Sequence, residues 1–180
     1  MAYLTAAVVL VGALCLLDLV LTFGVIRRLR ATSATVTRDE DGNELAPRAG
    51  DPVAGFASTT TGGQPVSRDS VTGALVAFLS PNCKPCKASL PEVLRLAAAG
   101  PVVAVVVGDP ADVTDMVAQL SPVARVLTEE PFGPVSEAFG VRSFPTFVKV
   151  SPDGTLAAAG LDVKQVARVK VPAPSFIRIP

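Results

Sequence analysis

Two cysteines, Cys83 and Cys86, stand three residues apart in the stretch FLSPNCKPCK, and the whole chain has only three. The apolar run Leu75–Leu79 ends just before them and is expected to be a buried strand, and a helical pattern begins at Lys84. Free amides at a helix N-terminus carry about half a positive charge and stabilise a thiolate. We therefore expect Cys83 to be a nucleophile of low pKa, and Cys86 to attack the mixed disulfide that Cys83 forms.

The neighbours of the pair support this chemistry. Lys84 and Lys87 add positive charge beside Cys83. Pro85 suits a helix start, because the N–H that proline lacks would be unpaired there. A purely structural pair is the alternative, but it leaves unexplained the strand before the pair and the helix after it, with Pro91 inside that helix.

Composition narrows the chemistry further. The chain has 16 basic and 16 acidic residues and no basic stripe, so a nucleic-acid partner is not expected. It has no histidine, which removes the commonest general base and metal ligand. A four-ligand Cys/His zinc site cannot be built within one chain from three cysteines, so we expect neither a metal nor another cofactor.

Apolar runs and helical patterns alternate from Asp51 onward, and a Ser-Pro-Asp-Gly turn at 151–154 is expected to close a hairpin. This order indicates an α/β sandwich with a mixed sheet. The run Val102–Val107 is apolar throughout, so it is expected to be a parallel, central strand. Further strands are expected at Val123–Leu127, Thr146–Val150 and Thr155–Ala159, and helices at Lys84–Ala99, Asp109–Leu120 (capped by Asp109 or Asp112), Gly133–Phe139 and Val163–Val169.

The segment Tyr3–Ile26 has 24 residues and one charge, Asp18. As a helix it would be about 36 Å long, enough to cross a hydrocarbon core of about 30 Å. A central Asp costs about 3 kcal/mol on the insertion scale, less than the roughly 4–8 kcal/mol that the apolar side chains return. A cleavable signal peptide fits less well, because its positive charges should precede the apolar run, whereas Arg27, Arg28 and Arg30 follow it.

These patterns divide the chain into a transmembrane anchor at 1–30, a polar linker at 31–50, a globular domain at 51–170 and a proline-rich tail at 171–180. Within the anchor, Cys15 and Asp18 share one helical face. They could form a helix–helix contact or a relay. We favour the simpler interpretation, in which Cys15 is an ordinary small apolar residue and a local water defect accommodates Asp18.

A second motif, VRSFPTF, follows the pair by about 60 residues and opens an expected strand. Taken alone, its proline would be trans, since only about 5–6% of X–Pro bonds in folded proteins are cis. It belongs, however, to a larger set of motifs: Gly50-Asp51-Pro52, Phe56, a hairpin at Gly62–Val66, Cys83-Lys84-Pro85-Cys86, Pro91 and Ser143-Phe144-Pro145-Thr146. With this set, residues 50–167 resemble the thioredoxin superfamily, and more closely its membrane-anchored TlpA/ResA-like disulfide reductases. The form FLSPNCKPCK after a membrane helix is most similar to the methylamine-utilisation MauD type.

The resemblance implies a thioredoxin-like fold, with a mixed central sheet flanked by helices and an N-terminal transmembrane helix. It implies that Cys83 and Cys86 cycle between dithiol and disulfide, with proteins that bear disulfides or thiols as partners. It also implies that the Phe144–Pro145 bond is cis and packs against the pair, where the Phe144 backbone could pair with an extended substrate. The chain departs from the family at Asn82, where a Trp is usual, at Ser89, where many members carry Glu, and in lacking a clear buried acid.

Two other classes of protein share single features with this sequence. A peroxiredoxin needs Pro-x-x-x-Thr/Ser-x-x-Cys, and although Ser80 fits this pattern, Val76 stands in the place of the proline. A redox-inactive thioredoxin-like module that binds a partner at the membrane through its Pro145 face is the closer alternative.

The sequence and the resemblance differ on the side of the membrane at which the globular domain lies. The three arginines after the apolar segment favour a cytoplasmic domain by the positive-inside rule. Members of the resembled branch generally face outward, where partner proteins carry disulfides. We adopt the outward side, a single-pass protein of the cell membrane with an extracytoplasmic domain, which would need a membrane electron donor.

Overall fold

The computed structural model describes Tyr3, Gly12, Cys15 and residues 46–171. The chain divides into two compact units, Met1–Ala34 and Thr35–Pro180. In the first unit the three described residues are helical and exposed. The rest of the expected membrane segment Tyr3–Ile26, most of the linker and nearly all of the tail lie outside the described residues. Among the residues described, no helix is both long enough and apolar enough to cross a membrane.

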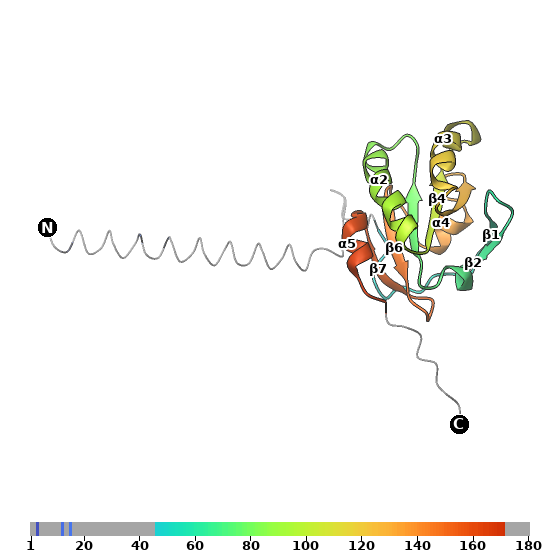
Figure 1. Cartoon of the computed structure of the whole chain (residues 1–180). Coiled ribbons are helices and arrows are strands. Elements are labelled where there is room, and N and C mark those ends of the chain that lie inside the picture. Colours follow the sequence, from blue (N-terminus) through green and yellow to red (C-terminus); the bar gives the residue numbers. More distant parts are fainter. Residues whose placement is uncertain (1–2, 4–11, 13–14, 16–45, 172–180) are drawn as a thin grey trace, which may run out of the picture. The chain divides into compact units, whose positions relative to one another are not determined.

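Residues 46–171 are built around a five-stranded mixed sheet in the order β5-β4-β3-β6-β7 (Figure 1). Strands β3, β4 and β5 are parallel, whereas β6 runs antiparallel to β3 and β7 antiparallel to β6. The carboxyl ends of β3, β4 and β5 therefore share one edge of the sheet with the start of β6. The strand bounds are Leu75–Leu79 (β3), Val102–Val107 (β4), Arg125–Glu129 (β5), Thr146–Val150 (β6) and Leu156–Gly160 (β7).

Helices and the small β1–β2 hairpin cover the two faces of the sheet. Buried side chains of α2, α3 and α5 form one apolar cluster with the sheet. Side chains of β2, η2 and α4 form a second cluster on the other face. The bounds are Lys84–Ala99 (α2), Pro110–Leu120 (α3), Pro134–Ala138 (α4), Val163–Arg168 (α5), Arg68–Val71 (η2), and Ala57–Thr59 with Pro65–Ser67 for the β1–β2 hairpin.

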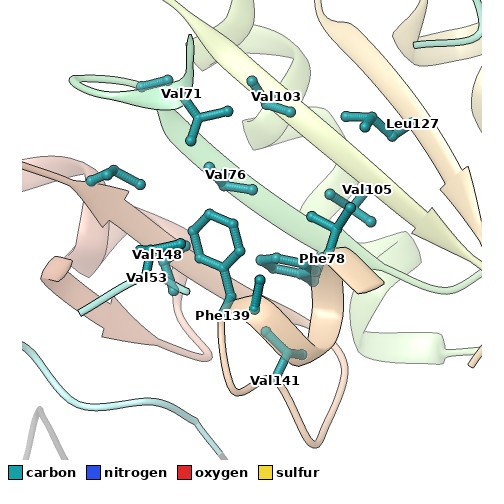
Figure 2. Packing of buried hydrophobic residues seen from close by; sticks show 14 of the residues in the cluster. Val53, Val71, Val76, Phe78, Val103, Val105, Leu127, Phe139, Val141 and Val148 are labelled. Carbon is teal, nitrogen blue, oxygen red and sulfur yellow. The ribbon is translucent and has the colours of Figure 1, made fainter. Parts of the chain in front are cut away.

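The central strand β3 shows why its sequence is apolar at every position. Successive strand side chains point to opposite faces, so a strand covered on both faces needs no polar positions. Val76 and Phe78 enter the cluster with α4, and Leu75, Ala77 and Leu79 enter the cluster with α2. Figure 2 shows Phe78 beside Phe139, with ring centroids 5.3 Å apart.

Most expected elements are confirmed, but one strand begins later than expected. Strand β4 is parallel and buried as expected, but β3 occupies the middle of the sheet. The third expected strand, Val123–Leu127, lies two residues later, because Val123 and Ala124 belong to a turn whose amides bind the Leu120 carbonyl. The N-cap of α3 is Asp109, as one alternative proposed, but its side chain makes no capping hydrogen bond.

Candidate active site

The cysteine pair stands at the junction of β3 and α2. After Leu79 the chain turns, and the Cys83 amide donates to the Ser80 carbonyl (3.2 Å). Cys83 is the N-cap of α2, with an extended backbone, and its carbonyl accepts the Lys87 amide at 3.2 Å. The pair therefore lies at the carboxyl edge of the parallel strands, where a helix N-terminus directs free amides toward it.

Cys83 and Cys86 form a disulfide, with their Cα atoms 5.2 Å apart, the pairing that the resemblance implied. The Cys86 amide donates to the Cys83 Sγ at 3.1 Å. Cys83 is half-buried, whereas Cys86 is fully buried in the cluster beneath α2. The more accessible sulfur is thus the one that receives an amide of the helix start.

The second motif lies against the pair. The Phe144–Pro145 peptide bond is cis, as the resemblance implied. The Phe144 carbonyl oxygen is 3.5 Å from the Cys83 Sγ. Strand register brings this loop to the pair, because Thr146 at the start of β6 is paired with Phe78 near the end of β3. The Thr146 hydroxyl fixes the loop further by donating to the Ser143 carbonyl at 2.7 Å.

The other expected site residues surround the pair on the surface. Lys84, Pro85 and Lys87 are exposed on the first turn of α2. The Pro85 carbonyl accepts a hydrogen bond from the Ser89 hydroxyl at 2.9 Å. Ser89, which replaces the Glu usual in the resembled family, is therefore engaged with its own helix.

A hydrogen bond between the side chains of Asn82 and Asp112 was not predicted from the sequence. The Asn82 side-chain amide donates to the Asp112 carboxylate at 3.0 Å and so ties the active-site loop to α3. Thirty residues separate the two, so no local pattern announces the contact. Beside it lies a groove of about 400 Å³, lined by Pro81, Asn82, Lys87, Leu90, Asp112, Asp115, Met116 and Gln119.

Buried acids are absent from residues 46–171, where the buried polar side chains are Thr60, Ser136 and Thr146. The sequence had likewise shown no clear counterpart of the thioredoxin acid in β3. Among residues 46–171, no buried carboxylate is therefore available to take up a proton from Cys86.

Glu129, at the end of β5, organises the loop that follows. Its carboxylate accepts the amides of Val135 (3.0 Å) and Ser136 (2.9 Å) and also the Ser136 hydroxyl. It thereby caps α4 and fills the space beside Gly133, where an added Cβ would lie 2.6–2.9 Å from Glu129 side-chain atoms. The loop from Glu129 to α4 thus has one tightly specified conformation.

Gly133→Ala is therefore expected to lower the free energy of unfolding by about 1–3 kcal/mol, because the new methyl group forces the Glu129 carboxylate from its hydrogen bonds. Gly55→Ala is the matched control, since a Cβ there meets nothing within 4 Å. Urea unfolding followed by circular dichroism would measure both variants. Equal unfolding midpoints for Gly133→Ala and the parent protein would contradict the packing described.

Comparisons with known proteins show which solved structures resemble this chain. No protein-family model matches the chain, and no curated protein sequence matches it. Solved structures do match. A secreted disulfide oxidoreductase of Mycobacterium tuberculosis, described as homologous to E. coli DsbE, is 26% identical, with a TM-score of 0.51, over 59% of this chain and 83% of that one.

Two further matches agree with the first. The pneumococcal exposed lipoprotein thioredoxin Etrx1 of Streptococcus pneumoniae is 27% identical, with a TM-score of 0.52, over 63% of this chain and 95% of that one. A thio-disulfide isomerase of Thermus thermophilus, 23% identical over 63% of this chain and 86% of that one, shares the fold with a TM-score of 0.53. The thioredoxin-like fold and the paired cysteines together support a protein-disulfide oxidoreductase.

Proposed function

We propose that the protein is a membrane-anchored thiol-disulfide oxidoreductase of the TlpA/ResA-like branch, closest to the MauD type, which exchanges disulfides with partner proteins through Cys83 and Cys86. One observation carries the proposal. The half-buried Cys83 Sγ accepts a helix-start amide at 3.1 Å, whereas its partner Cys86 is fully buried. An amide hydrogen bond is stronger to a thiolate than to a thiol, so the accessible sulfur is the one activated as the nucleophile.

The reduced protein would act in two displacements. The Cys83 thiolate attacks one sulfur of the partner's disulfide, so that a mixed disulfide forms and one partner thiolate leaves. The Cys86 thiol then loses its proton and attacks the Cys83 sulfur, which closes the Cys83–Cys86 disulfide and releases the second partner thiolate. The partner gains two electrons and the protein loses two. A dithiol donor must reduce the pair before the next cycle.

The anchor and the outward side also belong to the proposal. The apolar composition of Tyr3–Ile26 supports a single membrane span. The solved relatives of M. tuberculosis and S. pneumoniae are described as secreted and as an exposed lipoprotein, which supports an extracytoplasmic domain. On that side a membrane dithiol protein would have to supply the electrons.

A Cys86→Ser variant tests the exchange directly. Without the resolving thiol, the full-length reduced variant is expected to accumulate a mixed disulfide through Cys83 when mixed with insulin as a model disulfide protein. Non-reducing electrophoresis and peptide mass spectrometry would identify the linkage. The Cys83→Ser/Cys86→Ser double variant is the control and should trap nothing.

The thiolate is tested separately by alkylation. In the Cys86→Ser variant, Cys83 is expected to react with iodoacetamide at pH 6–7 faster than an ordinary thiol such as free glutathione. A Cys83 that alkylates no faster than glutathione and traps no insulin would leave the redox-inactive partner-binding module as the better description.

A further inference from the structure

The side chain of Phe132 is exposed to solvent, and its backbone has a strained conformation. Its side chain is 71% exposed, in the loop between β5 and α4. Its φ is +62°, and it is the one non-glycine residue with a positive φ in the described part of the chain. For a bulky side chain this conformation is an outlier that persists only where the surrounding structure enforces it.

The surrounding loop enforces it. The Gly133 amide donates to the Glu130 carbonyl at 3.0 Å and closes the turn at Phe132. On one side of the turn, the Glu129 carbonyl accepts the Gly108 amide at 3.1 Å, and on the other the Glu129 carboxylate caps α4. Phe132 is therefore held out from the surface by fixed backbone rather than by contacts of its own ring.

The loop lies on the same edge of the sheet as the cysteine pair. Leu79 at the end of β3 is paired with Val106 of β4, and Val106 is paired with Thr128 of β5. Two strand spacings place Thr128 about 10 Å from Leu79. Cys83 follows Leu79 by four residues, and Phe132 follows Thr128 by four, so both loops leave the sheet at this edge.

We propose that Phe132 is a substrate-docking residue, which binds an apolar side chain of the disulfide-bearing partner protein while Cys83 exchanges with its disulfide. The inference rests on the function proposed above. A rigid aromatic side chain on fixed backbone loses little conformational entropy on contact, which is why such residues serve as anchors at interfaces. An extended chain covers about 3.3 Å per residue, so the two strand spacings of about 10 Å between Leu79 and Thr128 correspond to about three residues of an extended partner chain. The position of the apolar side chain relative to the partner's cysteine is therefore varied from three residues upward.

A peptide series tests the contact. Each peptide carries one cysteine in a mixed disulfide with 2-mercaptoethanol, with a single Leu placed three, four, five or six residues away in an otherwise Ser/Gly sequence. The reduced full-length protein, in mild detergent, is mixed with each peptide, quenched with acid, and its oxidation measured by mass spectrometry. The parent protein is expected to react about five- to tenfold faster with the best Leu peptide than with the all-Ser/Gly peptide.

Phe132→Gly should abolish this preference, because glycine adopts positive φ without strain and keeps the turn while the ring is lost. Phe132→Leu should retain part of it. Val123→Ser is the matched control: Val123 is also exposed (40%), but precedes β5 at the opposite edge of the sheet, so its removal should leave the preference intact.

Each outcome decides between the two proposals. The proposal for Phe132 is overturned if no Leu position accelerates the parent protein, or if the preference survives in Phe132→Gly. Oxidation by hydroxyethyl disulfide, a small disulfide without a peptide, is measured as well. The proposal is also overturned if Phe132→Gly slows oxidation by hydroxyethyl disulfide and by the Leu peptides equally, because the residue then acts through the cysteine pair. Failure of the parent protein to oxidise with any disulfide would instead refute the proposed function.

Discussion

Cys83→Ser is expected to reduce disulfide exchange to the uncatalysed rate, a loss of at least about 10³-fold. The serine hydroxyl is almost never ionised at neutral pH and cannot form a disulfide, so the amide at 3.1 Å has no thiolate to stabilise. Cys86 cannot replace it as the attacking group, because its side chain is fully buried beneath α2. The rate of insulin reduction, with dithiothreitol as electron donor and the variant in its full-length form, would measure the loss.

Cys15→Ser is the matched control for this loss. Cys15 is exposed and outside any disulfide in the described structure, and it belongs to the other compact unit. Its replacement should leave the rate of insulin reduction unchanged within twofold. If Cys83→Ser kept more than a tenth of the parent rate, or if Cys15→Ser lost most of it, the assignment of Cys83 as nucleophile would be wrong.

The parts of the site that could be predicted are those encoded locally. The run Leu75–Leu79 must be buried on both faces, and the pattern from Lys84 to Ala99 must be a helix, so the position of Cys83 at their junction follows from a few consecutive residues. By contrast, the approach of Phe144 to Cys83 depends on β6 pairing antiparallel to β3. Only the resemblance to a known family indicated that contact in advance.

What could not be predicted depends on tertiary contacts or on single dihedral angles. The hydrogen bond from Asn82 to Asp112 joins the active-site loop to the first turn of α3, two segments that the parallel pairing of β3 and β4 brings together. Val123 reads as the start of a strand, yet a turn closed on Leu120 leaves it exposed. The positive φ of Phe132 depends on Glu129 and its hydrogen bonds across the loop, and the sequence gives no sign that an aromatic residue there faces solvent.

The two faces of β3 pack against different parts of the site. One face holds α2 and with it Cys86. On the other face, Phe78 packs against Phe139 (ring centroids 5.3 Å apart), and Phe139 packs in turn against Phe56 (5.7 Å). Phe139 follows α4 and stands five residues before Phe144. The aromatic packing therefore helps to position the loop whose carbonyl meets Cys83.

Phe78→Ala should consequently lower the free energy of unfolding by about 3–5 kcal/mol, the range for truncating a fully buried aromatic side chain that leaves a cavity. Phe132→Ala removes the same atoms from a site that is 71% exposed, and should change the free energy of unfolding by no more than about 0.5 kcal/mol. Urea unfolding of both variants, oxidised and full-length, followed by far-ultraviolet circular dichroism, would give the two values under identical conditions.

The contrast between these variants is more informative than either value. If Phe132→Ala costs as little as expected, the ring at 132 contributes nothing measurable to the fold, although the loop holds it at a strained φ of +62°. An interaction outside the domain would then have to account for it, as docking of a partner beside Cys83 does. A loss for Phe132→Ala comparable with that for Phe78→Ala would mean that the ring packs against its own domain in solution, and Phe132 could not be free to bind a partner.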